Sequence, residues 1–115
     1  MRKEGVGVLD FGIILDDLFD NPRILIKATP YEWYKWLLRM GYKPEPLGQG
    51  NLSGVPFEQG GGFILRWGGD KMLQYHPSER SHHDGAYWKL SSGNKGIVWY
   101  DMQAAEIRRK GGNSG

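Results

Sequence analysis

The sequence predicts an α+β domain in which two N-terminal helices pack on a four-stranded antiparallel sheet. Two observations carry this prediction: apolar residues recur at helical spacing in the first part of the chain, and they alternate with polar residues from residue 63 onward. Helices followed by a run of strands are typical of α+β domains. A length of 115 residues fits a single domain. We therefore expect helices on one face of the sheet and an open face that is free for a ligand.

The first helix is predicted near the N-terminus, in a helical part that spans about residues 8–41. Apolar residues recur at helical spacing from Phe11 to Phe19, and aspartates occupy the other side of the helix. Asn21-Pro22 ends this run, because proline interrupts the hydrogen-bond pattern of a continuing helix.

The second helix is predicted to begin at Thr29 and to end at Gly41. Thr29 is a capping residue, Pro30 suits the first helical turn, and Glu32 completes a capping box. Gly41 fits the left-handed position that ends many helices. The apolar stripe of this helix consists of Trp33, Trp36, Leu37 and Met40.

A loop and four strands are predicted to follow the helices. Residues 43–62 contain three prolines and repeated glycines, which indicates a structured loop. Gly68-Gly69-Asp70 is interpreted as a three-residue hairpin turn; a two-residue turn would reverse one strand relative to the other. Residues 102–110 are expected to form a short helix, in a tail of residues 102–115. The strands are expected at 63–67, 71–76, 86–92 and 96–101, in a sheet region of about 63–101.

Composition excludes several classes of protein. The chain has no cysteine, which removes disulfides, thiolate zinc sites and thiol nucleophiles. No apolar run reaches the roughly 18 residues of a membrane span, so we expect none. The net charge of +2 is distributed unevenly: residues 1–62 have 7 basic and 8 acidic side chains, and residues 63–115 have 8 basic and 5 acidic ones with all three histidines. An anion-binding surface is therefore expected in the second half.

Strand alternation predicts which side chains occupy the open face. Trp88 and Leu90 belong to the core in the third strand, so the residues between them point the other way. The three-residue turn likewise determines which residues of the two preceding strands share a face. The polar residues expected on this face are Arg66, Gln74, His76, Tyr87, Lys89 and Ser91, beside Ile64 and Met72, with His82 and His83 in the loop above them.

Aromatic rings beside cations suit single-stranded nucleic acid, because rings stack on bases and cations contact phosphates. Imidazoles transfer protons near neutral pH. One histidine would deprotonate a ribose 2′-OH, and Lys89 or Arg66 would stabilise charge on the phosphate. A second histidine, Tyr87 or Lys89 would assist the 5′-oxygen leaving group. These groups together predict RNA cleavage without a metal or other cofactor.

A histidine cluster offers an alternative reading as a metal site. The side chains of His76, His82, His83 and Asp84 are chemically sufficient for zinc, but their spacing matches no metal motif with a known mechanism. Gly60-Gly61-Gly62 precedes a strand and lacks the Gly-Lys-Ser/Thr ending, so it is not a phosphate loop.

The stretch from Gly60 to Asp101 resembles the C-terminal toxin domains of bacterial polymorphic toxins, including those of contact-dependent growth inhibition systems. The resemblance rests on Trp67-Gly68-Gly69-Asp70-Lys71, on Tyr75-His76-Pro77 and on the run from His82 to Gly93. Such domains are similar to the barnase/EndoU/colicin/RelE-type ribonuclease superfamily, in which helices pack on a small antiparallel sheet.

The resemblance implies a metal-independent ribonuclease, with tRNA as the expected substrate and a 2′,3′-cyclic phosphate as product. It further implies delivery by a large secreted or cell-surface protein, action in the target-cell cytoplasm, and neutralisation by a cognate immunity protein. Asp84 departs from the His-His-Gly-Gly form expected there. Carried over to this sequence, the catalytic residues are His83, Lys89, Ser91 and Tyr87, and the substrate-binding residues are Arg66, His76, His82, Ser92 and Tyr100.

Two non-catalytic readings of the open face stay open. An RNA-binding module would use the same rings and cations without needing histidines. A protein-interaction domain would have the face covered by a partner, and its association would show little of the salt dependence that phosphate contacts produce.

Overall fold

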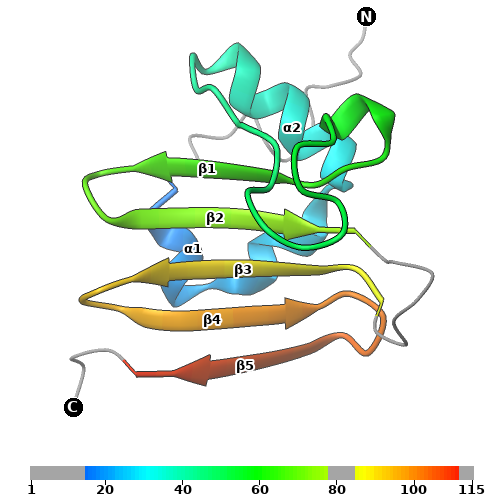
Figure 1. Ribbon diagram of the computed structural model, residues 1–115. Helices are drawn as coiled ribbons and strands as arrows, with labels where there is room; N and C mark the ends of the chain where they lie inside the picture. The colour runs from blue at the N-terminus through cyan, green and yellow to red at the C-terminus, as the bar shows by residue number, and fades with distance from the viewer. Residues whose placement is uncertain (1–14, 78–84, 112–115) are drawn as a thin grey trace, which may run out of the picture.

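A five-stranded antiparallel sheet with strand order β1-β2-β3-β4-β5 organises the part of the chain that the structure describes (Figure 1). The structure is a computed structural model and describes residues 15–77 and 85–111. The predicted α+β class is confirmed, with one strand more than the sequence indicated. The strands are β1 (Phe63–Trp67), β2 (Lys71–His76), β3 (Tyr87–Ser92), β4 (Gly96–Asp101) and β5 (Glu106–Lys110).

The second predicted helix is confirmed as α2 (Pro30–Arg39). Its capping box is complete: the Glu32 amide donates to Thr29 Oγ1 at 3.1 Å, and the Thr29 amide donates to Glu32 Oε1 at 2.8 Å. These bonds satisfy backbone donors that the helix itself leaves unpaired. Gly41 has a φ of 92° just after the helix, as predicted from its sequence position.

The first helix is shorter than predicted within the described residues. The helix α1 spans Asp17–Asp20, and Asn21 ends it as expected. A 3-10 helix, η2 (Pro22–Lys27), follows, which the sequence analysis did not identify. Residues 8–14 of the predicted helical part lie outside the described residues. None of the described helices is long and apolar enough to span a membrane.

The core lies between the helices and one face of the sheet. Trp88 on β3 has no exposed surface, and its ring contacts that of Trp33 on α2 at 6.3 Å between centroids. The Trp33 Nε1–H group donates to the Leu25 carbonyl at 2.9 Å, which ties η2 to α2. On β3 the buried residues alternate with half-buried ones, as a sheet covered on one side requires. The helices α1 and η2 lie behind the sheet in Figure 1, so its other face is not covered by them.

The C-terminal segment corrects the sequence analysis. Residues 102–110 were expected to be helical, but residues 102–105 form a turn and β5 pairs with β4 along its whole length. Two backbone amides of the turn, those of Gln103 and Ala104, donate to Asp101 Oδ1 at 3.0 and 3.1 Å. Arg109 links β5 to α1, because its Nη1 donates to the Phe19 carbonyl at 2.9 Å. The edge strand β5 thus carries mostly charged side chains.

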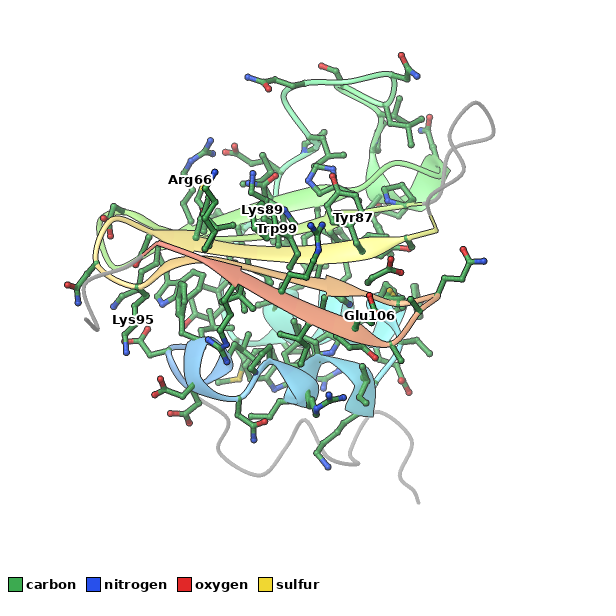
Figure 2. All side chains as sticks on the ribbon, turned by 90° about the horizontal axis from the view of Figure 1, so that it is seen from below. Arg66, Tyr87, Lys89, Lys95, Trp99 and Glu106 are labelled. Atoms are coloured by element: carbon green, nitrogen blue, oxygen red, sulfur yellow. The ribbon has the colours of Figure 1, made fainter. Side chains whose placement is uncertain are left out.

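The loop of residues 43–62 rises on the open side of the sheet, beside β1 and β2 (Figures 1 and 2). Glu45 and Ile64 exchange two backbone hydrogen bonds, and Leu47 is buried. A short 3-10 helix, η3 (Phe57–Gln59), ends the loop. Glycine is required at Gly62, since a Cβ there would overlap the Tyr75 carbonyl oxygen and approach the Leu47 side chain. This close approach explains why glycines precede β1.

A partly exposed polar contact joins the N-terminal helical part to the first hairpin. Asp16 accepts from Trp67 Nε1 at 2.7 Å and from Lys71 Nζ at 2.9 Å. The hydrogen bonds from Trp67 and Lys71, and the positive charge of Lys71, lower the pKa of the Asp16 carboxyl below its ordinary value of 3.8. The carboxylate thus stabilises the folded chain in its charged form.

We expect Asp16→Asn to lower the melting temperature by a few degrees at pH 7, since a partly exposed ion pair contributes about 1 kcal/mol or less. Because the folded pKa lies below the unfolded value, this contribution is present above about pH 4 and is lost as the pH falls through the folded pKa. Thermal unfolding of both proteins from pH 7 to pH 2 measures it, and the two curves should converge in acid. A constant difference at all pH values would contradict the assignment.

Candidate functional site

The open face of the sheet is defined by strand register. Lys89 on β3 is paired with Gln74 on β2 and with Trp99 on β4, and Trp99 is paired with Arg108 on β5. Paired residues share a face, so these four side chains form one row across the sheet. Figure 2 shows Arg66, Tyr87, Lys89 and Trp99 on the side of the sheet opposite to α1. The expected positions of Arg66, Gln74, His76, Tyr87, Lys89 and Ser91 on one face agree with this register.

Lys89 lies in the middle of this row. Its side chain is half-buried, and within residues 15–77 and 85–111 its ammonium group has no hydrogen bond or ion pair. By contrast, Lys71 and Lys95 form ion pairs with Asp16 and Asp20 on the helical side. An ammonium group flanked by a neutral amide and an indole retains its full capacity to bind an anion.

His76 and Tyr87 form a stacked pair one row further along the face. Their ring centroids are 4.6 Å apart and the ring planes differ by 5°. His76 Nε2 lies 2.8 Å from Gln74 Oε1. Which of the two ring nitrogens carries the proton depends on the tautomer of the imidazole. His76 and Lys89 are diagonal neighbours on adjacent strands. The Cβ atoms of such a pair are usually about 7 Å apart.

Trp99 and Arg108 form a cation–π pair on the other side of Lys89. The Arg108 guanidinium carbon lies 5.2 Å from the centroid of the Trp99 ring. The sequence analysis did not identify either residue. Alternation along Ile97-Val98-Trp99-Tyr100 was the available signal for Trp99, because Val98 and Tyr100 are apolar core residues. Arg108 could not be placed on this face because residues 102–110 were expected to form a helix.

Cations predominate on most of this face. Besides Lys89, it includes Arg66, Arg108 and Lys110, which the register places on β1 and β5. Arg66 is exposed and faces Glu45 across 3.8 Å, a long and solvated ion pair. Acidic side chains occur at the opposite end of β4 and β5, where Asp101 pairs with Glu106 and also caps the turn.

Three of the predicted site residues are not available on the open face. Ser92 and Tyr100 lie on the helix-covered face and are buried, so their prediction as substrate-binding residues is corrected. Ser92 has a turn-forming role instead, because its Oγ accepts from the Lys95 amide at 2.8 Å. Ser91 is on the correct face, but its Oγ is buried and has no partner among the described residues. This burial argues against direct contact between Ser91 and a substrate.

The remaining predicted residues belong to the connection between β2 and β3. His82, His83 and Asp84 lie outside the described residues. The described chain on either side of that connection ends at Pro77 and Gly85, next to the His76–Tyr87 pair. Among the residues described, no group of three or more potential metal ligands occurs.

Comparison of the chain with protein-family models, curated proteins and solved structures found no match. The reading of the open face therefore depends on its own geometry. That geometry consists of an ammonium group with no partner in residues 15–77 and 85–111, the stacked His76–Tyr87 rings and the Trp99–Arg108 cation–π pair, on a face that the helices leave uncovered.

Proposed function

We propose that the open face binds RNA and cleaves it without a metal ion, and that tRNA is its substrate. One observation carries the proposal: Lys89 has no partner in the described structure and lies diagonally across from His76, between the His76–Tyr87 ring pair and the Trp99–Arg108 cation–π pair. An unpaired cation binds a phosphate, rings stack on bases, and an imidazole supplies the proton acceptor that a metal-free reaction needs.

The proposed reaction is a transesterification followed by release of the product. The neutral imidazole of His76 accepts the proton of a ribose 2′-OH, and the 2′-oxygen forms a bond to the adjacent phosphorus. The bond from phosphorus to the 5′-oxygen breaks, which leaves a 2′,3′-cyclic phosphate and a 5′-OH. Lys89 stabilises the negative charge on the phosphate oxygens as it increases. A second histidine of the sequence, His82 or His83, or else Tyr87, is proposed to protonate the leaving oxygen.

The resemblance to polymorphic toxin domains extends this proposal to a biological role. We propose that the domain acts in the cytoplasm of a target bacterium after delivery by a larger secreted protein, and that a cognate immunity protein neutralises it. A partner with an acidic surface would complement Lys89 and Arg108. Expression in the cytoplasm of a bacterial host is expected to stop growth, and co-expression of the neighbouring reading frame is expected to restore it.

The activity itself is tested with total tRNA in buffer that contains EDTA. We expect cleavage fragments with a 2′,3′-cyclic phosphate at one new end and a 5′-OH at the other, both identified by mass spectrometry. Because the 2′-OH is the attacking group, an oligonucleotide with 2′-deoxyribose at the cleavage position should be resistant. Cleavage that requires added divalent metal would contradict this mechanism and support a metal-dependent nuclease.

An RNA-binding module without catalysis is the second candidate function. The same aromatic rings and cations favour it, since they can bind RNA without catalysing a reaction. A gel shift of tRNA with no fragment after prolonged incubation, and normal growth of the expressing host, would establish this function in place of the ribonuclease.

A further inference from the structure

Trp99 is the largest apolar side chain on the open face among the described residues, and no step of the proposed reaction uses it. It is half-buried and lies on the face of the sheet that is opposite to the core. Its register partners are both basic, Lys89 on one side and Arg108 on the other. An indole between two cations, on a face away from the helices, has the composition of a nucleotide subsite.

The position of Arg108 extends this subsite toward β5. Its guanidinium lies over the Trp99 ring at 5.2 Å, where the face of the ring attracts a positive charge. A guanidinium plane also stacks on bases and binds phosphates, so Arg108 extends the platform that Trp99 begins. Lys89 and Arg108 lie two strands apart, about 10 Å at the usual strand spacing. A cation is therefore available to the phosphates of a nucleotide chain on either side of Trp99.

We propose that Trp99 and Arg108 form a base-stacking subsite that selects unpaired nucleotides. The proposal rests on the RNA-binding function proposed above and names its substrate class: RNA that is single-stranded at the point of contact. A base inside a duplex is stacked on its neighbours on both sides, so an indole ring cannot lie against its face. A base in a tRNA loop or single-stranded end can leave its stack and lie on Trp99. RNA that is fully paired lacks this contact.

The test measures binding separately from cleavage. The ligands are an RNA oligonucleotide with 2′-O-methyl groups, which removes the attacking hydroxyl, and a duplex of the same sequence. We expect Trp99→Leu to weaken binding of the single strand about 10- to 100-fold, the loss typical of one stacked base. Trp99→Phe should recover most of the affinity, because it restores an aromatic face, and the already weaker binding of the duplex should change little.

Leucine and phenylalanine both retain an apolar side chain suited to a strand, and circular dichroism with thermal unfolding checks that each variant is folded. The matched control is Tyr31→Leu. Tyr31 is an exposed ring on α2 with Lys35 at 5.5 Å from its centroid, a similar ring and cation pair outside the sheet. We expect its affinity for RNA to be unchanged.

The outcomes separate this inference from the proposed function. Cleavage of tRNA by the wild type together with unchanged single-strand affinity of Trp99→Leu would overturn the subsite alone, and a protein partner would then be the better occupant of Trp99. Selective loss of single-strand binding without any cleavage by the wild type would support the subsite and refute the ribonuclease. An equal loss for single strand and duplex would also overturn the subsite, because it would show a general effect on the face.

Discussion

Lys89→Met is expected to lower the rate of tRNA cleavage about 100- to 1,000-fold while the fold is unchanged. The size of the effect follows from the role proposed for the ammonium group, since a positioned group that stabilises charge on the reacting phosphate contributes this much. The fold should be unaffected because the ammonium group has no partner in residues 15–77 and 85–111, so nothing in that part is left unpaired when it is removed. Methionine retains the length and apolar stem of lysine. Single-turnover cleavage with excess enzyme measures the rate.

The matched control for this variant is Lys95→Met. Lys95 is in the turn between β3 and β4, 3.8 Å from Asp20 of α1, and thus has the same charge near the other side of the sheet (Figure 2). It should retain full activity, which would show that net charge alone does not explain the loss. Lys89→Arg is expected to have an intermediate rate, because it keeps the charge and changes the geometry. Equal rates for Lys89→Met and Lys95→Met would remove Lys89 from the mechanism.

Much of the sheet is predictable because its turns and its alternation agree. Gly68-Gly69-Asp70 was interpreted as a three-residue turn, and the register pairs Trp67 with Lys71 as that turn requires. Both glycines of the turn have positive φ values, 59° and 89°, which explains their presence. Once the turn is known, the faces of β1 and β2 follow. The faces of β3 follow from the two apolar residues between its polar ones.

The fifth strand was not predictable from its composition. Only Ile107 is apolar in Glu106–Lys110, because the strand lies at the edge of the sheet and most of its side chains are exposed. Charged residues are common on edge strands, where they discourage pairing with other chains. The turn before it places Ala105 at a φ of 57°, a conformation that alanine seldom adopts. The expectation of a short helix over residues 102–110 was therefore wrong.

The site was predictable only where the faces of the strands were derived. Tyr87 and Lys89 were placed correctly by alternation around Trp88. No such argument was made for β4, so Tyr100 was assigned to the site although it is buried, and Trp99 was overlooked. The contact between Trp99 and Arg108 requires β5 to pair with β4, and no pattern in the sequence identified β5. Errors about the site thus followed directly from errors about the neighbouring strands.

His76→Ala is expected to lower tRNA cleavage about 100-fold or more, the usual contribution of a general base. An imidazole accepts a proton only in its neutral form, so the wild-type rate should fall as the pH is lowered into the acidic range. The variant lacks this group, and its residual rate should lose that dependence. The measurement is the single-turnover rate from pH 5 to pH 8 for both proteins. The same experiment with His83→Ala tests the histidine that the sequence analysis favoured.

Two further variants separate chemistry from packing at this position. Tyr87→Phe retains a ring to stack on His76, at 4.6 Å in the wild type, and should keep most of the activity if the phenol is not the proton donor. Gln74→Leu removes the side-chain amide that contacts His76 Nε2 and positions the imidazole. It should lower the rate without removing the pH dependence of the rate, because the imidazole itself is still present. Loss of activity in His83→Ala alone, with a wild-type pH profile in His76→Ala, would transfer the role of general base to the connection between β2 and β3. Retention of the full rate in both histidine variants would contradict histidine catalysis on this face.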